Sequence, residues 1–197
     1  MEKLTTNFSK HKSKNPIQKL LINNFYHNLI KLMETIKPES ILDAGCGEGF
    51  TLNKLFEHKI GKKLEGIDGS EIAVSIGKKM FPNLTLKKGD IYKLPFNENS
   101  FDLVICTEVL EHLENPEKAL NEIIRVSKKN IIVSVPNEPF FRLSNFLRGK
   151  NLKRFGNDPG HINNWGIFSF KKLIRGQNLK IKKIELPFPW IMLLLEK

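Results

Sequence analysis

Cysteine is scarce in this sequence, and so are the long apolar runs that cross membranes. Cys46 and Cys106 are the only cysteines and cannot build a disulfide framework, which favours a reducing compartment. Residues 1–15 are polar and lysine-rich and lack the apolar core of a signal peptide. The longest apolar run, residues 190–195, is far shorter than a transmembrane helix requires. We therefore expect a cytoplasmic protein without a transmembrane segment, for which peripheral contact with a membrane stays open.

Acidic residues are also few, except in the middle of the chain. The net charge is +11. Residues 1–37 carry 7 basic against 2 acidic residues, residues 38–137 carry 13 against 15, and residues 138–197 carry 12 against 4. Two basic flanks around a nearly neutral middle suggest contact with an anionic partner, although solvated lysines would explain the pattern equally well.

Short apolar runs alternate with helical patterns from residue 40 onward, without an internal repeat or a Gly/Ser linker. This alternation is typical of βαβ units and predicts an α/β fold with a mostly parallel sheet. The last two apolar runs are separated by Pro187-Phe188-Pro189, which favours an antiparallel pair. The expected helices are 17–36, 50–58, 70–80, 116–127 and 168–176, and the expected strands are 40–45, 64–68, 84–90, 101–106, 130–135, 180–186 and 190–196.

The chain divides into two parts on this pattern. We expect a basic helical extension over residues 1–37 and the main domain over residues 38–197. Residues 138–165, which are rich in Pro, Gly, Asn and Arg, interrupt the main domain as a lid-like insertion. Long irregular segments of this kind usually serve a function.

A glycine-rich loop follows the first expected strand. Glycines at 45, 47 and 49 let the backbone turn sharply and approach a ligand closely. Their G-x-G-x-G spacing differs from the dinucleotide-binding G-x-G-x-x-G, and no Gly-Lys-Ser/Thr follows as in a P-loop. Asp43 lies two residues before the first glycine, where it would repel a pyrophosphate but attract a cationic ligand.

Two further acids lie at the ends of the next strands. Asp68 comes 23 residues after Gly45, an offset at which an acid can accept hydrogen bonds from ribose hydroxyls. Asp90 ends the third strand and can accept from an adenine amino group, with Ile91 against the ring. Because ligands bind at the carboxyl ends of parallel strands, the three acids together predict a nucleoside site.

At this point the sequence closely resembles the class I S-adenosylmethionine-dependent methyltransferase family. The resemblance rests on residues 42–49 (LDAGCGEG), 66–70 (GIDGS), 89–96 (GDIYKLPF) and 101–113 (FDLVICTEVLEHL), which follow in the family's order and spacing. It implies a Rossmann-like α/β fold: a seven-stranded, mostly parallel sheet whose last strand is antiparallel, with helices on both faces.

The resemblance also implies S-adenosylmethionine as cofactor. The glycine loop and Asp43 would surround its methionine part, Asp68 would hold the ribose, Asp90 and Ile91 the adenine, and the residues after the fourth strand would lie beside the methionine end. The cofactor residues expected in this way are Asp43, Gly45, Gly47, Gly49, Asp68, Gly69, Asp90, Ile91, Thr107 and Glu108.

Methyl transfer from a sulfonium depends mainly on positioning, but a hydroxyl acceptor profits from a general base. His112, in the string Glu-x-x-Glu-His after the fourth strand, is the best candidate, with Glu111 beside it and His161 in the insertion. A histidine that merely hydrogen-bonds a loop is an alternative for both. His11, His27 and His58 are expected at the surface.

The same residues are similar to the metal site of small-RNA 3′-terminal 2′-O-methyltransferases of the Hen family. Two carboxylates, Glu108 and Glu111, and two imidazoles, His112 and His161, offer ligands for a divalent ion. The string is widespread among metal-free methyltransferases, however, and no further part of the RNA-binding signature is evident. We therefore expect no metal in the preferred site.

The insertion combines basic and aromatic residues. Positions 140, 143 and 147 share one face of a short amphipathic helix. Its aromatics can pack on the domain, which is the simplest interpretation, or reach a lipid-like substrate as in the similar ubiquinone-pathway O-methyltransferases, or accompany phosphate contacts. The residues that could contact an anionic group of the substrate are Arg142, Arg148, Lys150 and Arg154.

The sequence thus predicts a methyltransferase acting on an oxygen or nitrogen atom of a small metabolite or lipid-linked acceptor. One alternative is an RNA 2′-O-methyltransferase with a divalent metal, for which nucleic acid would be the partner. Another is a non-catalytic S-adenosylmethionine-binding protein with a regulatory or assembly role.

Overall fold

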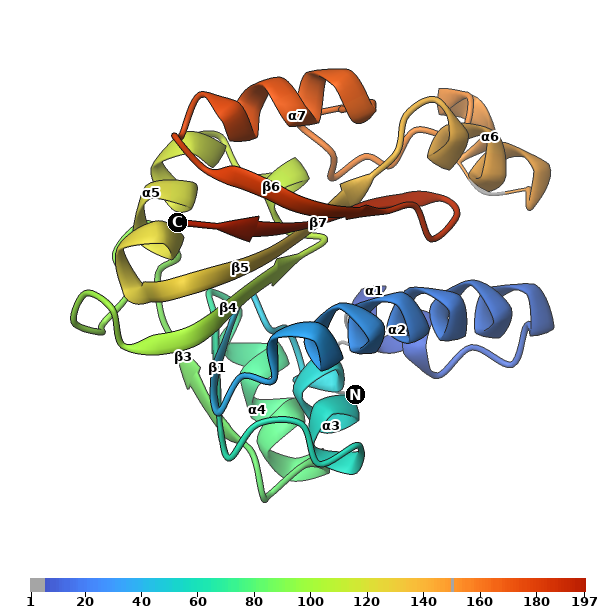
Figure 1. Ribbon diagram of the computed structural model, residues 1–197. Coiled ribbons are helices and arrows are strands. Elements are labelled where there is room, and N and C mark those ends of the chain that lie inside the picture. Colours follow the sequence, from blue (N-terminus) through green and yellow to red (C-terminus); the bar gives the residue numbers. More distant parts are fainter. Residues whose placement is uncertain (1–5, 150) are drawn as a thin grey trace.

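Within the described residues, 6–149 and 151–197, seven strands form a single sheet in this computed structural model (Figure 1). The strand order is β3-β2-β1-β4-β5-β7-β6, and β7 runs antiparallel to both β5 and β6. The predicted Rossmann-like α/β sheet with an antiparallel last strand is confirmed. The strands are β1 (Ser40–Ala44), β2 (Lys63–Asp68), β3 (Thr85–Lys88), β4 (Phe101–Thr107), β5 (Ser127–Pro136), β6 (Lys180–Glu185) and β7 (Trp190–Glu196).

Helices cover both faces of the sheet, as expected (Figure 1). One face packs on α2 (Pro16–Ile36), α3 (Phe50–Glu57) and α4 (Glu71–Met80). The other packs on α5 (Pro116–Val126) and α7 (Ile167–Arg175). Because both faces are covered, central strands such as β5 and β7 are buried along most of their length and need continuous apolar sequence.

Local signals in the sequence determine where several of these helices begin. The side chain of Asn15 accepts hydrogen bonds from the first backbone N–H groups of α2, and Pro16 follows it. Ser70 caps α4 in the same way, and Asn115 caps α5. Such caps explain why the predicted helix starts lie within one residue of the observed ones.

Helix α2 belongs to the core, although it lies in the predicted extension. Leu29, Leu32 and Met33 are fully buried against the sheet, whereas Ile17 and Leu20 at the start of the helix are exposed. The division of the chain at residue 38 stays a prediction, and residues 1–5 lie outside the described part.

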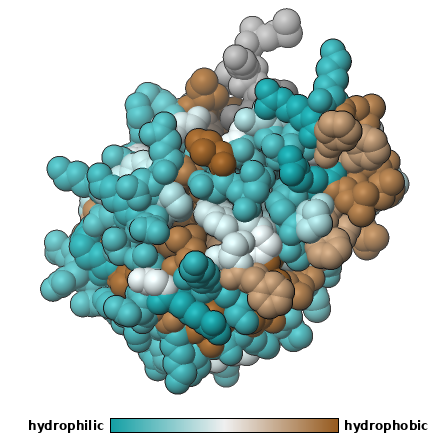
Figure 2. Space-filling view, turned by 90° about the horizontal axis from the view of Figure 1, so that it is seen from above, coloured by the Kyte–Doolittle hydropathy of each residue, from teal (hydrophilic) through white to brown (hydrophobic). Residues whose placement is uncertain are grey.

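The insertion contains a helix, α6 (Phe140–Leu147), and a single turn, η2 (Leu152–Arg154). Its aromatics mostly do not pack on the domain, contrary to the simplest expectation. Phe140 and Phe146 are exposed because α6 presents this face to solvent, and Phe155, which follows η2, is exposed as well, while Phe141 packs against the core. Figure 2 shows hydrophobic side chains gathered at the right-hand edge of the face seen from above, where α6 lies. Within the described ranges, no helix has the length and apolar character needed to cross a bilayer.

Two substitutions in α2 test whether this helix is part of the folded core. Leu29→Ala removes a fully buried side chain and should lower the free energy of unfolding by about 2–5 kcal/mol. Leu20→Ala, in the same helix but 68% exposed, should change it by less than about 0.5 kcal/mol. Urea unfolding measures both. Equal effects at the two positions would contradict the packing described here.

Candidate functional site

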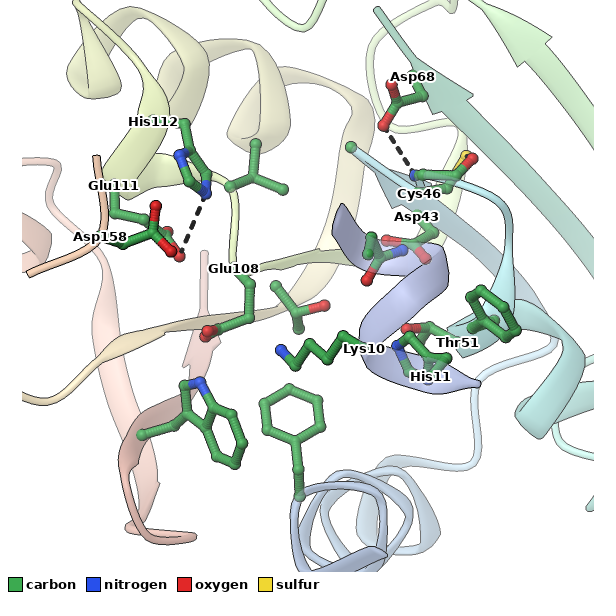
Figure 3. Close-up of a pocket in the computed structure, with 18 of the residues that line it drawn as sticks. Lys10, His11, Asp43, Cys46, Thr51, Asp68, Glu108, Glu111, His112 and Asp158 are labelled. Carbon is green, nitrogen blue, oxygen red and sulfur yellow. Dashed lines mark hydrogen bonds and ion pairs between the residues drawn. The ribbon is translucent and has the colours of Figure 1, made fainter. Parts of the chain in front are cut away.

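A cavity of about 910 Å³ opens at the carboxyl ends of β1, β2 and β4. The strand order reverses at β1, which pairs with β2 on one side and β4 on the other, so the loops that follow these strands separate there. Figure 3 shows Asp43 and Asp68 on one side of the cavity and Glu108 and Glu111 on the other. The cavity therefore has two halves, each with its own acids.

The glycine loop forms a wall of the first half. Gly45 N and Cys46 N both donate to Ile67 O, at 2.7 and 3.0 Å, and tie the loop to β2. At Gly45, φ is 88° and an added Cβ would lie 2.4 Å from a methyl group of Val109. A side chain at this position would therefore be excluded by both conformation and space.

The acids at the ends of β2 and β3 are held in place by the backbone. The Asp68 carboxylate accepts from Gly47 N and from Ser70 N, each at 2.7 Å, while a Cβ added at Gly69 would meet only Gly89 O, at 3.9 Å. Asp90 accepts from Tyr92 N at 2.8 Å in a tight turn and is exposed. Both carboxylates keep free acceptor positions toward the cavity.

Asp43 is the most deeply buried of these acids. It is 2% exposed, and its Oδ1 has no hydrogen-bond partner among the described residues. Burial, assisted by the charge of Asp68, raises the pKa of Asp43 to about 7. A buried carboxylate without a partner is stabilised by a cation, so this half of the cavity favours a positively charged ligand.

The second half contains two more buried carboxyl groups. Glu108 accepts from Ser134 Oγ at 2.9 Å. Glu111 is 1% exposed, and neither of its carboxylate oxygens has a hydrogen-bond partner from another described residue. Burial raises the pKa of both groups, and the charge of Glu108 raises that of Glu111 further. Both shifts favour the protonated form of the carboxyl groups, and a bound cation would oppose them.

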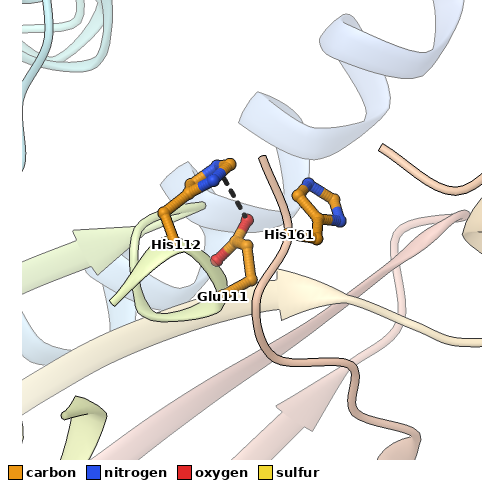
Figure 4. Close-up of side chains that lie close together, drawn as sticks. All are labelled: Glu111, His112 and His161. Atoms are coloured by element: carbon orange, nitrogen blue, oxygen red, sulfur yellow. Dashed lines mark ion pairs between the residues drawn. The ribbon is translucent and has the colours of Figure 1, made fainter. Parts of the chain in front are cut away.

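Two histidines lie beside Glu111 (Figure 4). Nδ1 of His112 donates to Gly160 O at 2.8 Å, since a carbonyl oxygen only accepts, and Nε2 lies 4.0 Å from Glu111 Oε1. The ring centroid of His161 lies 5.0 Å from that of His112. Burial lowers the pKa of His161 to about 4, so this ring is neutral at pH 7. The three side chains can move a proton or bind a cation.

The predicted cofactor and catalytic residues are thus brought together at the cavity, with one exception. Gly49 does not line the cavity; it begins α3 with φ of 82° and faces Leu86 behind the loop. The other predicted residues of the cavity wall are Asp43, Gly45, Gly47, Asp68, Gly69, Asp90, Ile91, Thr107, Glu108, Glu111, His112 and His161.

A short helix missing from the sequence prediction, α1 (Thr6–His11), packs over the glycine loop. Asn7 donates to the Glu48 carboxylate, and Lys10 extends into the cavity with Nζ 5.0 Å from the ring centroid of Trp190. Figure 3 shows Lys10 directed toward Glu108. Helix α1 has six residues and no apolar periodicity, so its sequence offers no signal of this placement.

The prediction that His11 lies at the surface is wrong. Its ring stacks on Phe50, with centroids 4.2 Å apart and an interplanar angle of 12°. Burial, followed by nearby lysine charges, lowers the pKa of His11 to about 3. His11 therefore anchors α1 as a neutral ring against α3.

The basic residues of the insertion differ in position. Arg148 lines the cavity, whereas Arg142 and Arg154 do not. Lys150 lies outside the described residues. The same wall contains apolar and amide side chains that the sequence did not single out, namely Gln18, Ile22, Phe25, Phe141, Asn145 and Trp190.

Comparison with known proteins agrees with this geometry. The family model described as a methyltransferase domain matches residues 42–134. A probable S-adenosylmethionine-dependent methyltransferase of Mycolicibacterium smegmatis is 29% identical over 113 residues, 56% of this chain and 43% of that protein. A ubiquinone biosynthesis O-methyltransferase of Coxiella burnetii is 30% identical over 112 residues, 55% of this chain and 47% of that protein.

A solved structure supports the fold over a longer stretch. The magnesium protoporphyrin IX methyltransferase of Synechocystis PCC 6803, with bound SAH, superposes with a TM-score of 0.70 at 18% identity, covering 98% of this chain and 95% of that one. The chain spans less than half the length of these two curated relatives.

The fold, the strand-end acids and the matched segment define a methyltransferase domain. Residues 42–134 match the methyltransferase domain family, and the chain is similar to class I S-adenosylmethionine-dependent methyltransferases in its motifs and its fold. The first half of the cavity fits the cofactor of this family, because the partnerless Asp43 oxygen suits a cationic group and the glycines leave room for close approach.

The variant Asp43→Asn tests whether this carboxyl group attracts the cofactor. A pKa near 7 means that the wild-type group is mostly protonated at about pH 6 and mostly ionised at about pH 7.5. Between these values the calorimetric affinity of the wild-type protein for S-adenosylmethionine should rise by roughly an order of magnitude. The Asp43→Asn protein should bind about tenfold more weakly at the higher pH and lack the rise.

The free protein should respond to pH in the opposite direction. Because the folded-state pKa lies above the ordinary 3.8, protonation of Asp43 favours the folded state. This contribution is fully present below about pH 4 and is lost as the pH rises through 7. Between about pH 6 and pH 8 the melting temperature should therefore fall further for the wild-type protein than for Asp43→Asn. Cofactor affinity that is independent of pH in both proteins would contradict the role of Asp43.

Proposed function

We propose that this chain transfers the methyl group of S-adenosylmethionine to an oxygen or nitrogen atom of a small metabolite or lipid-linked acceptor. One observation carries the proposal: a continuous cavity connects the strand-end acids Asp43 and Asp68 with the Glu111–His112–His161 cluster. A donor in the first half and an acceptor in the second half would meet beside Glu108.

The first half would hold the cofactor. Asp43 would stabilise its positive charge, and the glycine loop would follow its methionine part. Asp68 would accept from the ribose hydroxyls with the acceptor positions that Gly47 N and Ser70 N leave free. Asp90 and Ile91 would border the adenine. Support comes from their common placement along one wall of the cavity.

The second half would orient the acceptor and take its proton. Bound S-adenosylmethionine supplies a methyl group already activated on a sulfonium, so the chain must mainly align a nucleophile. His112 is suited to accept a proton at Nε2, because Gly160 O fixes the other ring nitrogen as a donor. Glu111, 4.0 Å away, would stabilise the protonated ring. His161, neutral at pH 7, would position the acceptor hydroxyl or amine.

The lining of the second half supports an acceptor with an apolar body. Ile22, Phe25 and Phe141 contribute apolar surface next to the histidines, and the Phe141 and His161 rings lie 5.2 Å apart. The apolar outer face of α6 adjoins this wall and would allow peripheral contact with a membrane that carries the acceptor. The name of the Coxiella burnetii relative, a ubiquinone biosynthesis O-methyltransferase, agrees with a lipid-linked acceptor.

Turnover of labelled S-adenosylmethionine tests the proposal. Purified protein is incubated with a cell extract that has been divided into small-molecule, lipid and RNA fractions, and label is expected in the first or second. In the responsive fraction His112→Ala should lower kcat by roughly 10²–10⁴-fold, because a general base is lost. The affinity for SAH, the demethylated form of the cofactor, should stay unchanged, since His112 lies in the acceptor half.

His58→Ala, an exposed histidine far from the cavity, serves as the matched control and should retain full turnover. Tight SAH binding without label in any fraction would favour a non-catalytic S-adenosylmethionine-binding protein instead.

The second candidate function is RNA 2′-O-methylation with a divalent metal. A specific observation favours it: Glu111, His112 and His161 each offer one ligand atom, and these atoms lie within 4.8 Å of one another. The carboxylate of Glu111 is buried and lacks a partner from another described residue, which is costly unless a proton or cation is bound. Glu108 is close enough to raise the pKa of Glu111 and would supply a fourth ligand.

Metal dependence distinguishes the two candidates. The preferred function predicts turnover that survives EDTA and a melting temperature that does not respond to Mn²⁺ or Co²⁺. RNA methylation predicts label in the RNA fraction, loss of turnover in EDTA, and a rise in melting temperature with Mn²⁺ that His161→Ala abolishes. His27→Ala, in the exposed part of α2, is the control for this variant.

A further inference from the structure

Arg148 is a half-buried cation in the acceptor half of the cavity. It follows the last residue of α6 and lines the cavity together with Phe141 and Asn145. Residues 141, 145 and 148 are spaced by four and three positions, so they share the inner side of the helix. The residues exposed on the outer side of α6 are Phe140, Leu143, Phe146 and Leu147.

The Arg148 side chain is held by three neutral acceptors. Nε donates to Ser144 O at 3.0 Å, one terminal nitrogen to Gln18 Oε1 at 3.2 Å, and the other to Asn145 Oδ1 at 2.7 Å. Gln18 and Asn145 are themselves buried, and Asn145 is anchored in turn by Gly156 O at 3.0 Å. The guanidinium therefore has a defined position between α2 and α6.

The charge of this guanidinium is not compensated. Among the ion pairs between described residues, none includes Arg148. Burial lowers the pKa of Arg148, and no carboxylate contributes a shift in the other direction. A guanidinium has five N–H groups, and three are used here, which leaves one on each terminal nitrogen. A partly desolvated cation with free donors is a site for an anion.

The surroundings restrict the kind of ligand. Ile22, Phe25 and Trp190 line the same cavity, and the rings of Phe25 and Trp190 pack edge-on with centroids 5.3 Å apart. Phe141, whose ring lies 5.2 Å from that of His161, is on the same side of α6 as Arg148. A ligand that reaches from the histidines past these side chains to Arg148 must therefore have an apolar body and a polar end.

We propose that Arg148 is the recognition site for an anionic group, a carboxylate or a phosphate, at the end of the methyl acceptor remote from the reacting atom. This inference rests on the proposed function, since it names the acceptor class for that same site. It makes Arg148 a specificity-determining residue: the acceptor is amphipathic and is bound by its apolar body and its charge together.

Small aromatic probes test the inference without knowledge of the true acceptor. Benzoate, phenyl phosphate and neutral benzamide are titrated calorimetrically into the full chain saturated with SAH. At least one anion should bind tenfold or more tightly than benzamide, because a charge-assisted contact is involved. Whichever of the two anions binds more tightly shows whether a carboxylate or a phosphate is the recognised group.

Two variants assign the effect to Arg148. Arg148→Gln should weaken binding of the preferred anion at least tenfold and leave benzamide binding unchanged. Arg148→Lys keeps the charge but loses the paired N–H donors of the guanidinium, so its affinity for the anion should lie between those of the wild type and Arg148→Gln. Arg175→Gln, an exposed arginine at the end of α7, is the matched control and should match the wild type. SAH affinity and melting temperature report whether each variant is folded.

Equal affinity of the wild-type protein for benzamide and both anions would overturn the inference, even if Arg148→Gln fails to fold. Equal weakening by Arg175→Gln and Arg148→Gln would also overturn it, because the effect would then reflect net charge alone. These outcomes leave SAH binding intact and do not affect the proposed function. Loss of SAH binding by the wild-type protein would instead refute the proposed function itself.

Discussion

The constraint on which this site depends is the burial of carboxyl groups at the carboxyl ends of parallel strands. Asp43 and Glu111 lie almost without solvent exposure, and each has at least one oxygen without a partner from another described residue. Removing an ionised carboxylate from water is costly, so each group either keeps a proton or faces a cation. The cavity is thereby suited to positively charged ligands at its centre, and the rest of the architecture holds these acids there.

The sheet and the loops contribute different parts of the cavity. The strand order reverses at β1, so the loops that follow the neighbouring strands separate and leave the cavity between them. The glycine loop forms one wall of this cavity and is held in place by its hydrogen bonds to Ile67 O. Beyond β4 and β5 the chain adds the histidines and α6, which line the proposed acceptor half. In this chain the proposed cofactor half is thus built on regular strand ends and the proposed acceptor half on less regular segments, and Arg148 belongs to the second.

Most of the fold was predictable from the sequence, because residues 40–136 alternate short apolar runs with helical patterns and carry clear caps such as Ser70. The strand-end acids were predictable for the same reason: parallel strands bring their carboxyl ends to one edge. The insertion and the N-terminal segment were less predictable. His11, in a polar and lysine-rich segment, is half-buried through its stacking on Phe50, a contact between residues 39 positions apart. Cytoplasmic location and the domain boundary stay predictions.

The sequence by itself predicted the mostly parallel sheet with its antiparallel last strand, the resemblance to methyltransferases and the acids at the strand ends, because these depend on local periodicity and short motifs. Only the tertiary structure decided which charged groups are desolvated and which of them meet. It distinguished Arg148, inside the cavity, from Arg142 and Arg154, and it brought Lys10 beside Trp190. The physical reason is that desolvation and long-range side-chain contacts depend on packing between distant segments, which composition and spacing do not encode.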